Sequence, residues 1–282
     1  TDDEYHIARV EVPEVFKTKP RDEWIRLQHA ADSAALPVLH PAEVLLDDQV
    51  EFVGQRVALP DADFGTIYQS APAVIFKGTP CAAPKPAPAI GADNGDLSKL
   101  AARPAPQIKP SGRAIKRPLE GIKVVDFSSF FAVGFGGRLL SDLGADVIKI
   151  EKFPNGDDAR QYQKPGDSEL PPSFRMINRG KRSLAIDIRH PLGKQALLRM
   201  AAQADVMTEN FRVGVMDRLG LGYEHVREVN PALIYCSITG YGSVGPLAEK
   251  GGFDLILQAF SGIISATGEP GRPAVKPGIS IA

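Results

Sequence analysis

Three basic residues of this chain could together bind an anionic ligand: Lys152, Arg189 and Arg218. Each lies at or near a predicted loop. Ammonium and guanidinium groups bind phosphate oxygens through charge-assisted hydrogen bonds. A single surface lysine or arginine is more often only solvated, so these residues predict a phosphate-binding site only if the fold brings them to one edge.

A second candidate anion site is the glycine-rich segment 133–137, which follows a hydrophobic segment and precedes a helical pattern. Backbone N–H groups at such a strand-to-helix turn can bind phosphate, although the turn can equally be purely structural. A dinucleotide-binding fingerprint would need a third glycine where this chain has Leu139. Glu151 lies at the end of the next predicted strand, which is the position of the acid that binds the ribose in dinucleotide-binding proteins. Lys152 follows it immediately, however. A nicotinamide- or flavin-dependent oxidoreductase therefore stays open as a weakened alternative.

Other residue types give no pattern for metal or triad chemistry. The five histidines have no ligand spacing, and none lies beside a serine or cysteine nucleophile in a known arrangement. Cys81 and Cys236 lie far apart, which argues against a disulfide framework and against a structural zinc site. Asp126 lies inside a hydrophobic segment, where a carboxylate must be paired, so a structural role is favoured over a catalytic acid. Phe211 is interpreted as a core residue rather than a ring that stacks on a ligand.

The elements that must position these residues alternate between strand and helix patterns. The expected strands are residues 122–127, 147–150, 184–188, a segment near 206, and 233–238. The expected helices include residues 138–143 and one that begins at Pro191 and turns Leu192, Ala196 and Met200 to one face. Such alternation predicts an α/β fold with a Rossmann-like parallel sheet and helices on both faces. Ligands bind beyond the carboxyl ends of such strands, here at residues 128–137, 151–154, 187–191 and 209–214.

A proline- and alanine-rich stretch, residues 80–117, is typical of a linker and separates this sheet from a smaller α+β segment, residues 1–79. Within the smaller segment, helices are expected at residues 19–32 and 41–45. A β-rich stretch is expected from Val50 to Phe76, broken by Pro60 and Gly65. The sequence thus predicts three parts: 1–79, 80–117 and 118–282.

The overall composition gives no general attraction to nucleic acid or to an anionic membrane. The formal net charge is −1, and 43% of the 282 residues are hydrophobic, which suits a globular protein with a core. No stretch of the chain has the length and hydrophobicity of a membrane span. A cytoplasmic location and a small-molecule partner are expected.

Several ordered motifs resemble the front half of class III coenzyme A transferases of the CaiB/BaiF type, a group that includes formyl-CoA:oxalate and carnitine-related CoA transferases. They are PLEGIKVVDF at 118–127, LGADVIKIE at 143–151, NRGKRSL at 178–184, ENFR at 209–212 and GVMDRLG at 214–220. The resemblance runs from residue 118 to residue 282. Residues before the linker resemble the tail of the same family, through FKTK at 16–19, DEW at 22–24 and GTP at 78–80. A tail that stands ahead of a front implies the junction of a fused, two-copy transferase.

The resemblance implies an enzyme that moves coenzyme A between an acyl-CoA thioester and a small carboxylic acid. Members use an aspartate nucleophile, which forms a mixed anhydride and then an enzyme-CoA thioester. That aspartate is expected just after Ala282, so no catalytic residue is expected within the chain, and the isolated chain is expected to bind coenzyme A without turnover. No metal and no nicotinamide is expected. An interlocked dimer, or a pseudo-dimer within one longer polypeptide, is the implied assembly.

The resemblance also implies a set of contacts to the bound acyl-CoA. These fall at Phe130, Phe131, Ala132, Lys152, Ile186, Asp187, Arg189, Asn210, Phe211 and Arg218. Lys152 stands where relatives often carry arginine, so it keeps the charge but loses the bidentate geometry.

Two further readings stay open within the family. One relative is a racemase that uses a histidine in a Gly-His-Asp segment to move a proton. This chain has Phe253 between Gly252 and Asp254, and phenylalanine cannot exchange a proton, so transfer is favoured over racemisation. The other reading is a non-catalytic CoA-binding module that supports an active copy.

Overall fold

The structure is a computed structural model that describes residues 4, 6–96, 99, 116–162, 165–166 and 168–280. Most of the predicted linker between residues 97 and 115 lies outside these ranges. The chain divides into two compact units, one made of residues 1–56 and 239–282 and the other of residues 57–238. Each unit is described by itself, and the predicted three-part division of the sequence stays a prediction.

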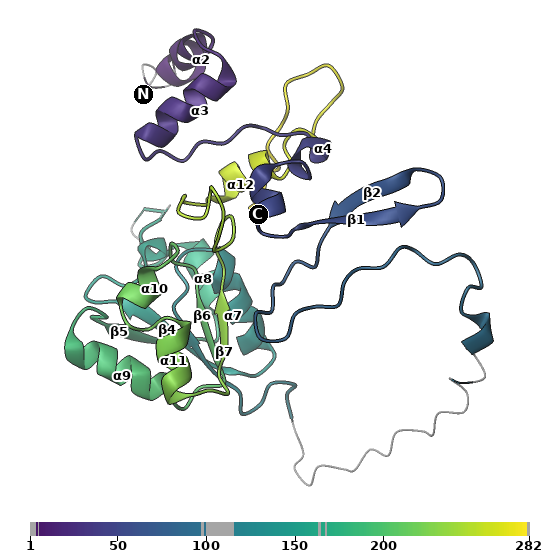
Figure 1. Ribbon diagram of the computed structural model, residues 1–282. Helices are drawn as coiled ribbons and strands as arrows, with labels where there is room; N and C mark the ends of the chain where they lie inside the picture. Colours follow the sequence, from purple (N-terminus) through teal and green to yellow (C-terminus); the bar gives the residue numbers. More distant parts are fainter. Residues whose placement is uncertain are drawn as a thin grey trace. The chain divides into compact units, whose positions relative to one another are not determined.

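The unit of residues 57–238 contains the predicted parallel sheet (Figure 1). Its strands are β3 (Lys123–Asp126), β4 (Asp146–Lys152), β5 (Arg182–Ile186), β6 (Val206–Glu209) and β7 (Ile234–Ser237). All neighbouring pairs are parallel, in the order β5-β4-β3-β6-β7. β5 ends two residues before its predicted end, because Asp187 already begins a turn in which its carbonyl accepts from His190 N. The α/β fold class is confirmed.

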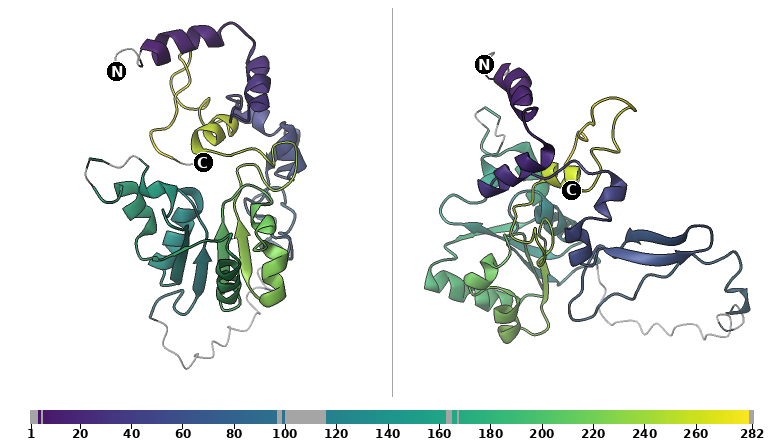
Figure 2. Two further views of the ribbon diagram at one scale, coloured as in Figure 1. Left: turned by 90° about the vertical axis from the view of Figure 1, so that its left-hand side faces the viewer. Right: turned by 45° about the horizontal axis from the view of Figure 1, so that its top comes forward.

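Helices cover both faces of this sheet (Figures 1 and 2). α7 (Ala132–Asp142) and α8 (Pro172–Asn178) pack together on one face, and α9 (Pro191–Ala201) and α11 (Tyr223–Val229) pack together on the other. The short helix α10 (Val215–Arg218) follows β6, and one 3₁₀ turn, η3 (Asp158–Arg160), follows β4.

The two faces of β3 show why the sheet needs both layers. Val124 packs in a cluster with Val147 of β4 and Leu140 of α7. Val125 lies on the opposite side, in a larger cluster with Leu197 of α9 and Val226 of α11. Successive strand residues point to opposite faces, so two adjacent buried valines require cover on both sides. Burying each side chain of this size contributes about 1.5–3 kcal/mol.

The glycine-rich segment forms part of a helix instead of the predicted turn. Gly134, Gly136 and Gly137 lie within α7, which begins at Ala132. A Cβ on Gly134 would lie 2.7 Å from Ile177 Cγ2, and one on Gly137 would lie 2.6 Å from Asp126 Oδ2. These two glycines therefore allow α7 to approach α8 and the end of β3 closely.

The buried face of α9 differs by one residue from the prediction. Gly193, Leu197 and Ala201 are buried, whereas Leu192 is 69% exposed. A Cβ at Gly193 would lie 2.1 Å from the carbonyl oxygen of Asp187, so this position faces the turn that precedes the helix. Glycine carries no hydrophobic signal, which explains why periodicity selected the neighbouring residue.

The segment before the linker contains short helices and one hairpin. Its elements are η1 (Ile7–Glu11), α2 (Val12–Phe16), α3 (Arg21–Ala30), α4 (Pro41–Val44), α5 (Asp48–Phe52), β1 (Arg56–Asp61) and β2 (Gly65–Ser70). The two predicted helices are confirmed. The predicted β-rich stretch is wrong at its start, because Val50 lies in α5, whose N-cap Asp47 accepts from Gln49 N. It is also wrong at Pro60, which lies inside β1 and does not break the strand. β1 belongs to a two-stranded sheet, where proline is tolerated.

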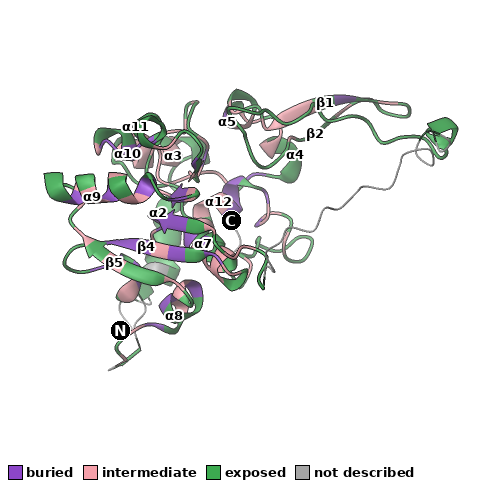
Figure 3. Cartoon of the chain, turned by 90° about the horizontal axis from the view of Figure 1, so that it is seen from below, coloured by how far each residue is buried: buried purple, intermediate pink, exposed green. Residues whose placement is uncertain are grey.

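Burial differs between these regions (Figure 3). β4 is buried along most of its length, while β2 is exposed at five of its six residues. Two short elements complete the description, namely η2 (Asn94–Asp96) and α12 (Asp254–Phe260).

Candidate functional site

The strand order creates a switch point between β3 and β6. The chain leaves β3 toward β4 on one side and leaves β6 toward β7 on the other. Open α/β sheets bind ligands in the crevice outside the carboxyl ends of strands at such a point. Asn210, which follows β6, joins the two ends: its Oδ1 accepts from Ser129 N at 2.8 Å and its Nδ2 donates to Ser129 O at 2.8 Å. This predicted site residue therefore fixes the loop that follows β3.

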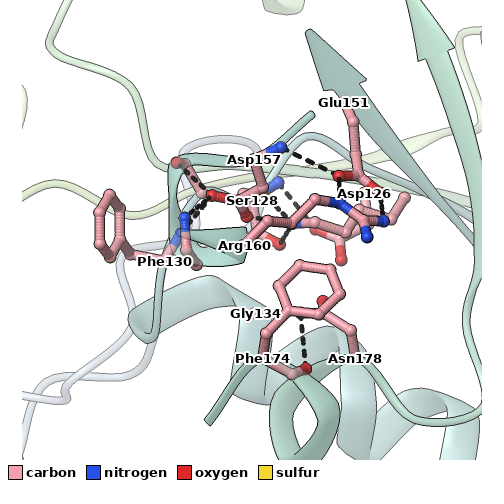
Figure 4. Close-up of polar contacts among 12 residues, drawn as sticks. Asp126, Ser128, Phe130, Gly134, Glu151, Asp157, Arg160, Phe174 and Asn178 are labelled. Carbon is pink, nitrogen blue, oxygen red and sulfur yellow. Dashed lines mark hydrogen bonds and ion pairs between the residues drawn. The ribbon is translucent and has the colours of Figure 1, made fainter. Parts of the chain in front are cut away.

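The loop after β3 is held in an uncommon backbone conformation at Phe130. Its φ is 57°, the left-handed region, which costs a non-glycine residue roughly 1–2 kcal/mol. Asp157 Oδ1 accepts from Ser129 Oγ at 3.2 Å and from Phe130 N at 3.4 Å. Figure 4 shows Phe130 at the end of this polar cluster, with its ring pointing away from it. The ring meets Tyr162 edge-on, with 5.6 Å between centroids.

A buried ion pair holds in place the carboxylate that binds the loop after β3. Lys149 Nζ lies 2.8 Å from Asp157 Oδ2, and the two side chains are only 2% and 3% exposed. Burial alone would raise the pKa of Asp157, but the Lys149 charge and hydrogen bonds outweigh it and the pKa is lowered. Lys149 Nζ also donates to the carbonyl of Ser128. The carboxylate that anchors Phe130 is thus kept ionised by a lysine inside the sheet.

A second pair joins Glu151, the last buried residue of β4, to Arg160. The guanidinium donates to both carboxylate oxygens at 2.6 and 2.7 Å, and Ser183 Oγ and Asp157 N donate to them at 2.7 and 2.9 Å (Figure 4). Burial opposes ionisation, yet these donors lower the pKa of Glu151 to about 2. Since both oxygens are engaged internally, the observation disfavours Glu151 as a ribose-binding acid and weakens the oxidoreductase alternative.

A third pair joins Asp126 of β3 to Lys181. Asp126 is fully buried, and its Oδ2 lies 2.8 Å from Lys181 Nζ. Its Oδ1 accepts from Ser128 N at 2.9 Å and from Thr208 Oγ1 at 3.0 Å. Lys181 also donates to the carbonyl of Gly134 at 2.8 Å, and burial lowers its pKa although Asp126 opposes this. These contacts support the structural interpretation of Asp126.

The three predicted cations lie at the same carboxyl edge without forming one cluster. Lys152 ends β4 and pairs with Asp158, both side chains being more than half exposed. Arg189 lies exposed in the turn after β5, where its N–H donates to Asp187 Oδ1 at 3.0 Å, and Arg218 lies exposed at the end of α10. Neighbouring strands of a sheet lie roughly 4.8 Å apart, so the three spacings from β5 to β6 make this edge of the sheet about 14 Å long. Such an edge suits an extended polyanion better than a single phosphate.

The remaining predicted contacts also lie at this edge. Ile186 ends β5 and Asp187 follows it. Ala132 is the first residue of α7, and the residue before it, Phe131, is the N-cap and makes no side-chain capping hydrogen bond. Phe211 packs partly buried against the main hydrophobic cluster, in agreement with its interpretation as a core residue.

The sequence interpretation missed four charged residues that hold this edge together, namely Lys149, Asp157, Arg160 and Lys181. Lys149 carried a signal, because a lysine inside a hydrophobic strand must find a buried partner. The others had none, since their partners lie 8 to 55 residues away in the sequence.

Two features are absent from the described ranges. Three or more His, Cys, Asp or Glu side chains do not gather there in a way that could hold a metal ion. None of the helices in these ranges has the length and hydrophobicity to span a bilayer.

Comparison with known proteins places two stretches of the chain in one family. Residues 4–94 and 119–282 match the sequence model described as CoA-transferase family III. The chain is 42% identical over 173 residues to succinate–glutarate CoA-transferase of Agrobacterium fabrum, and 45% identical over 164 residues to acetyl-CoA:oxalate CoA-transferase of Acetobacter aceti. These alignments cover 59% and 58% of the chain, but 43% and 42% of the relatives. The chain thus spans less than half the length of these curated relatives.

Solved structures agree with this assignment. A CAIB/BAIF family protein from Brucella suis is 46% identical with a TM-score of 0.56, and covers 58% of this chain and 44% of its own. Rv3272 from Mycobacterium tuberculosis is 42% identical with a TM-score of 0.53, and covers 57% of this chain and 45% of its own.

Proposed function

Because the chain belongs to CoA-transferase family III, we propose that it is part of an enzyme that transfers coenzyme A from an acyl-CoA thioester to a small carboxylic acid. The observation that carries the proposal is the family match across residues 119–282, which include the whole cationic edge of the sheet. Relatives named as transferases of glutarate and oxalate support a carboxylic acid as acceptor.

The carboxyl edge has the chemistry to hold coenzyme A, which carries a diphosphate and a ribose phosphate. The exposed side chains of Lys152, Arg189 and Arg218 would bind these phosphates. The uncapped first amides of α7 offer further donors at the switch point. Around them, Phe130, Phe131, Ala132, Ile186, Asp187, Asn210 and Phe211 would line the ligand. The internally paired charges beneath keep this edge rigid without competing for the phosphates.

In the whole protein, an aspartate carboxylate would attack the thioester carbonyl and expel the CoA thiolate, leaving a mixed anhydride. The thiolate would then attack the aspartyl carbonyl, release the donor acid as a carboxylate and leave an enzyme-CoA thioester. The acceptor carboxylate would complete the transfer through a second anhydride. The nucleophile is proposed to follow Ala282, so the chain itself would bind the ligand without turnover.

The same proposal includes a tandem arrangement of two family copies. Residues 1–79 would close an upstream copy, residues 80–117 would link the copies, and residues 118–282 would begin the second. In support, the family match is interrupted between residues 94 and 119, an interval that falls almost entirely in the proline-rich stretch. Two copies in one polypeptide would form a pseudo-dimer, whereas separate polypeptides would form an interlocked dimer.

Calorimetric titration of the chain with coenzyme A and, separately, with NAD tests the proposed ligand. Binding of coenzyme A that weakens with added salt is expected, with no measurable heat from NAD. Arg189→Ala and Arg218→Ala should each weaken coenzyme A about tenfold, because each removes a charged donor to phosphate. Arg199→Ala is the matched control, since Arg199 lies in the last turn of α9. Preferential binding of NAD, or an equal loss in the control, would contradict the proposal.

A further inference from the structure

Lys194, in the first turn of α9, is a half-buried cation without a counter-charge. The other described cations of the unit 57–238 that are buried or half-buried each pair with a carboxylate of the chain, and these are Arg138, Lys149, Arg160 and Lys181. The ammonium group of Lys194 makes no hydrogen bond or ion pair with any residue that the structure describes. Removing a charge partly from water without a partner costs free energy, so an anion from outside the chain would stabilise it.

This ammonium group lies on the turn that follows α10. A Cβ on Gly220 would lie 2.6 Å from Lys194 Cε and closer still to Nζ, so the absence of a side chain makes room for the lysine. The carbonyls at the end of α10 already have donors: that of Asp217 accepts from Gly220 N at 2.9 Å. The carbonyl of Met216 accepts from Leu221 N, also at 2.9 Å. Lys194 is therefore not needed to cap α10.

Arg218 places its charge at the opposite end of the same helix. A Cβ on Gly214, the N-cap of α10, would lie 3.1 Å from Arg218 Nη1. At a rise of about 1.5 Å per residue, the six steps from Gly214 to Gly220 cover about 9 Å. Asp217, between them in sequence, lies against Gly222 and pairs with neither cation in the described ranges. Because charge-assisted hydrogen bonds are about 2.8 Å long, donors this far apart suit two phosphates better than one.

We propose that Lys194 binds the ribose phosphate of coenzyme A while Arg218 binds its diphosphate, an inference that rests on the proposed function. The guanidinium of Arg218 lies at the end of α10 that follows β6, at the switch point where the first amides of α7 offer further donors. Lys194 is the outlying cation, on the face of the sheet that α9 covers and α7 does not (Figure 2). The ribose phosphate and the diphosphate are attached to different carbons of one ribose, so the ligand holds its charges apart as the two cations are.

Two ligands that differ only in the ribose phosphate test this assignment, namely coenzyme A and dephospho-coenzyme A. Calorimetry on the full chain should show that the wild type binds coenzyme A about tenfold more tightly, the value of one charge-assisted hydrogen bond. Lys194→Met should lower this preference to about twofold or less, because methionine has no charge to bind the phosphate. Its affinity for dephospho-coenzyme A should stay unchanged. Lys194→Arg should restore most of the preference, and Arg218→Ala should weaken both ligands alike.

Lys123→Met is the matched control, since Lys123 is exposed at the first residue of β3 and so lies at the amino edge of the sheet. It should keep the wild-type preference. Misfolding would lower both affinities rather than their ratio, and circular dichroism checks each variant.

The inference and the proposed function fail in different ways. If the wild type binds both ligands equally, or if Lys194→Met keeps the full preference, the assignment of Lys194 is overturned and the proposed function stands. The same holds if Arg218→Ala loses the preference and Lys194→Met does not. If the wild type binds neither ligand, the proposed function is overturned, and this inference with it.

Discussion

Replacing Lys181 with methionine is expected to lower the free energy of unfolding by about 3–5 kcal/mol, because it leaves the Asp126 carboxylate buried without its counter-charge. The side chains of Lys181 and Asp126 are 1% and 0% exposed, so water cannot take the place of the lost ammonium group. The carbonyl of Gly134 loses a donor as well. Urea unfolding followed by circular dichroism measures the change.

Two further variants separate charge from packing. Adding Asp126→Asn to Lys181→Met removes the unpaired charge, while the asparagine oxygen can still accept from Ser128 N and Thr208 Oγ1. The double variant should recover to within about 1–2 kcal/mol of wild type. Arg182→Met breaks only an exposed pair with Asp146 and should cost less than about 1 kcal/mol. A single variant as stable as wild type, or a double variant no better than the single, would contradict the account.

Glu151 should make the stability of the protein depend on pH in the acid range. Its pKa is lowered from an ordinary value of 4.5 to about 2, so the folded state favours the ionised form. Its contribution is therefore fully present above about pH 5 and is lost as the pH falls toward 2. At 1.36 kcal/mol for each unit by which the pKa is lowered, this change corresponds to roughly 3 kcal/mol.

The measurement is the urea midpoint at pH 7, 5 and 3 for wild type and Glu151→Gln. The variant should be less stable at pH 7, since Arg160 loses its carboxylate, and the difference should shrink as the pH is lowered. Comparing the two proteins cancels the titration of other carboxylates, including Asp157. Glu228→Gln, at an exposed position of α11, should follow wild type at every pH. A constant difference between wild type and Glu151→Gln would show that the proposed ionic contribution is absent.

The sequence was sufficient to predict the alternating strands and helices, because each strand is a short hydrophobic run and several helices begin or end with a proline or glycine. It also placed Lys152, Arg189, Asn210 and Arg218 near the same edge, since Lys152 ends a strand of a parallel sheet and the other three follow strands of it. Their common location followed from topology alone.

The local geometry of the edge could not be predicted in the same way. The glycine-rich composition predicted a turn at Gly134 and Gly137, because only the packed structure reveals that α7 needs them to approach α8 and Asp126. The pairing of Lys181 with Asp126 spans 55 residues, and Lys181 lies between α8 and β5, outside the hydrophobic pattern of either element. The reciprocal bridge between Asn210 and Ser129 likewise exists only once β3 and β6 are neighbours.

The buried and exposed charges of the sheet edge have different roles in this account. Lys149, Arg160 and Lys181 are engaged by carboxylates within the protein and stabilise the loops. Arg189 and Arg218 are exposed, and the proposal assigns ligand binding to them. Neutralising the first group should therefore chiefly lower stability, and neutralising the second should chiefly lower affinity for the ligand.

A crystal structure of the chain grown with coenzyme A tests the proposed binding edge most directly. We predict that the phosphates of the ligand lie outside the carboxyl ends of β3 to β6, in contact with at least one of Lys152, Arg189 and Arg218. Coenzyme A bound at any other surface, with these three side chains left in solvent, would contradict the account.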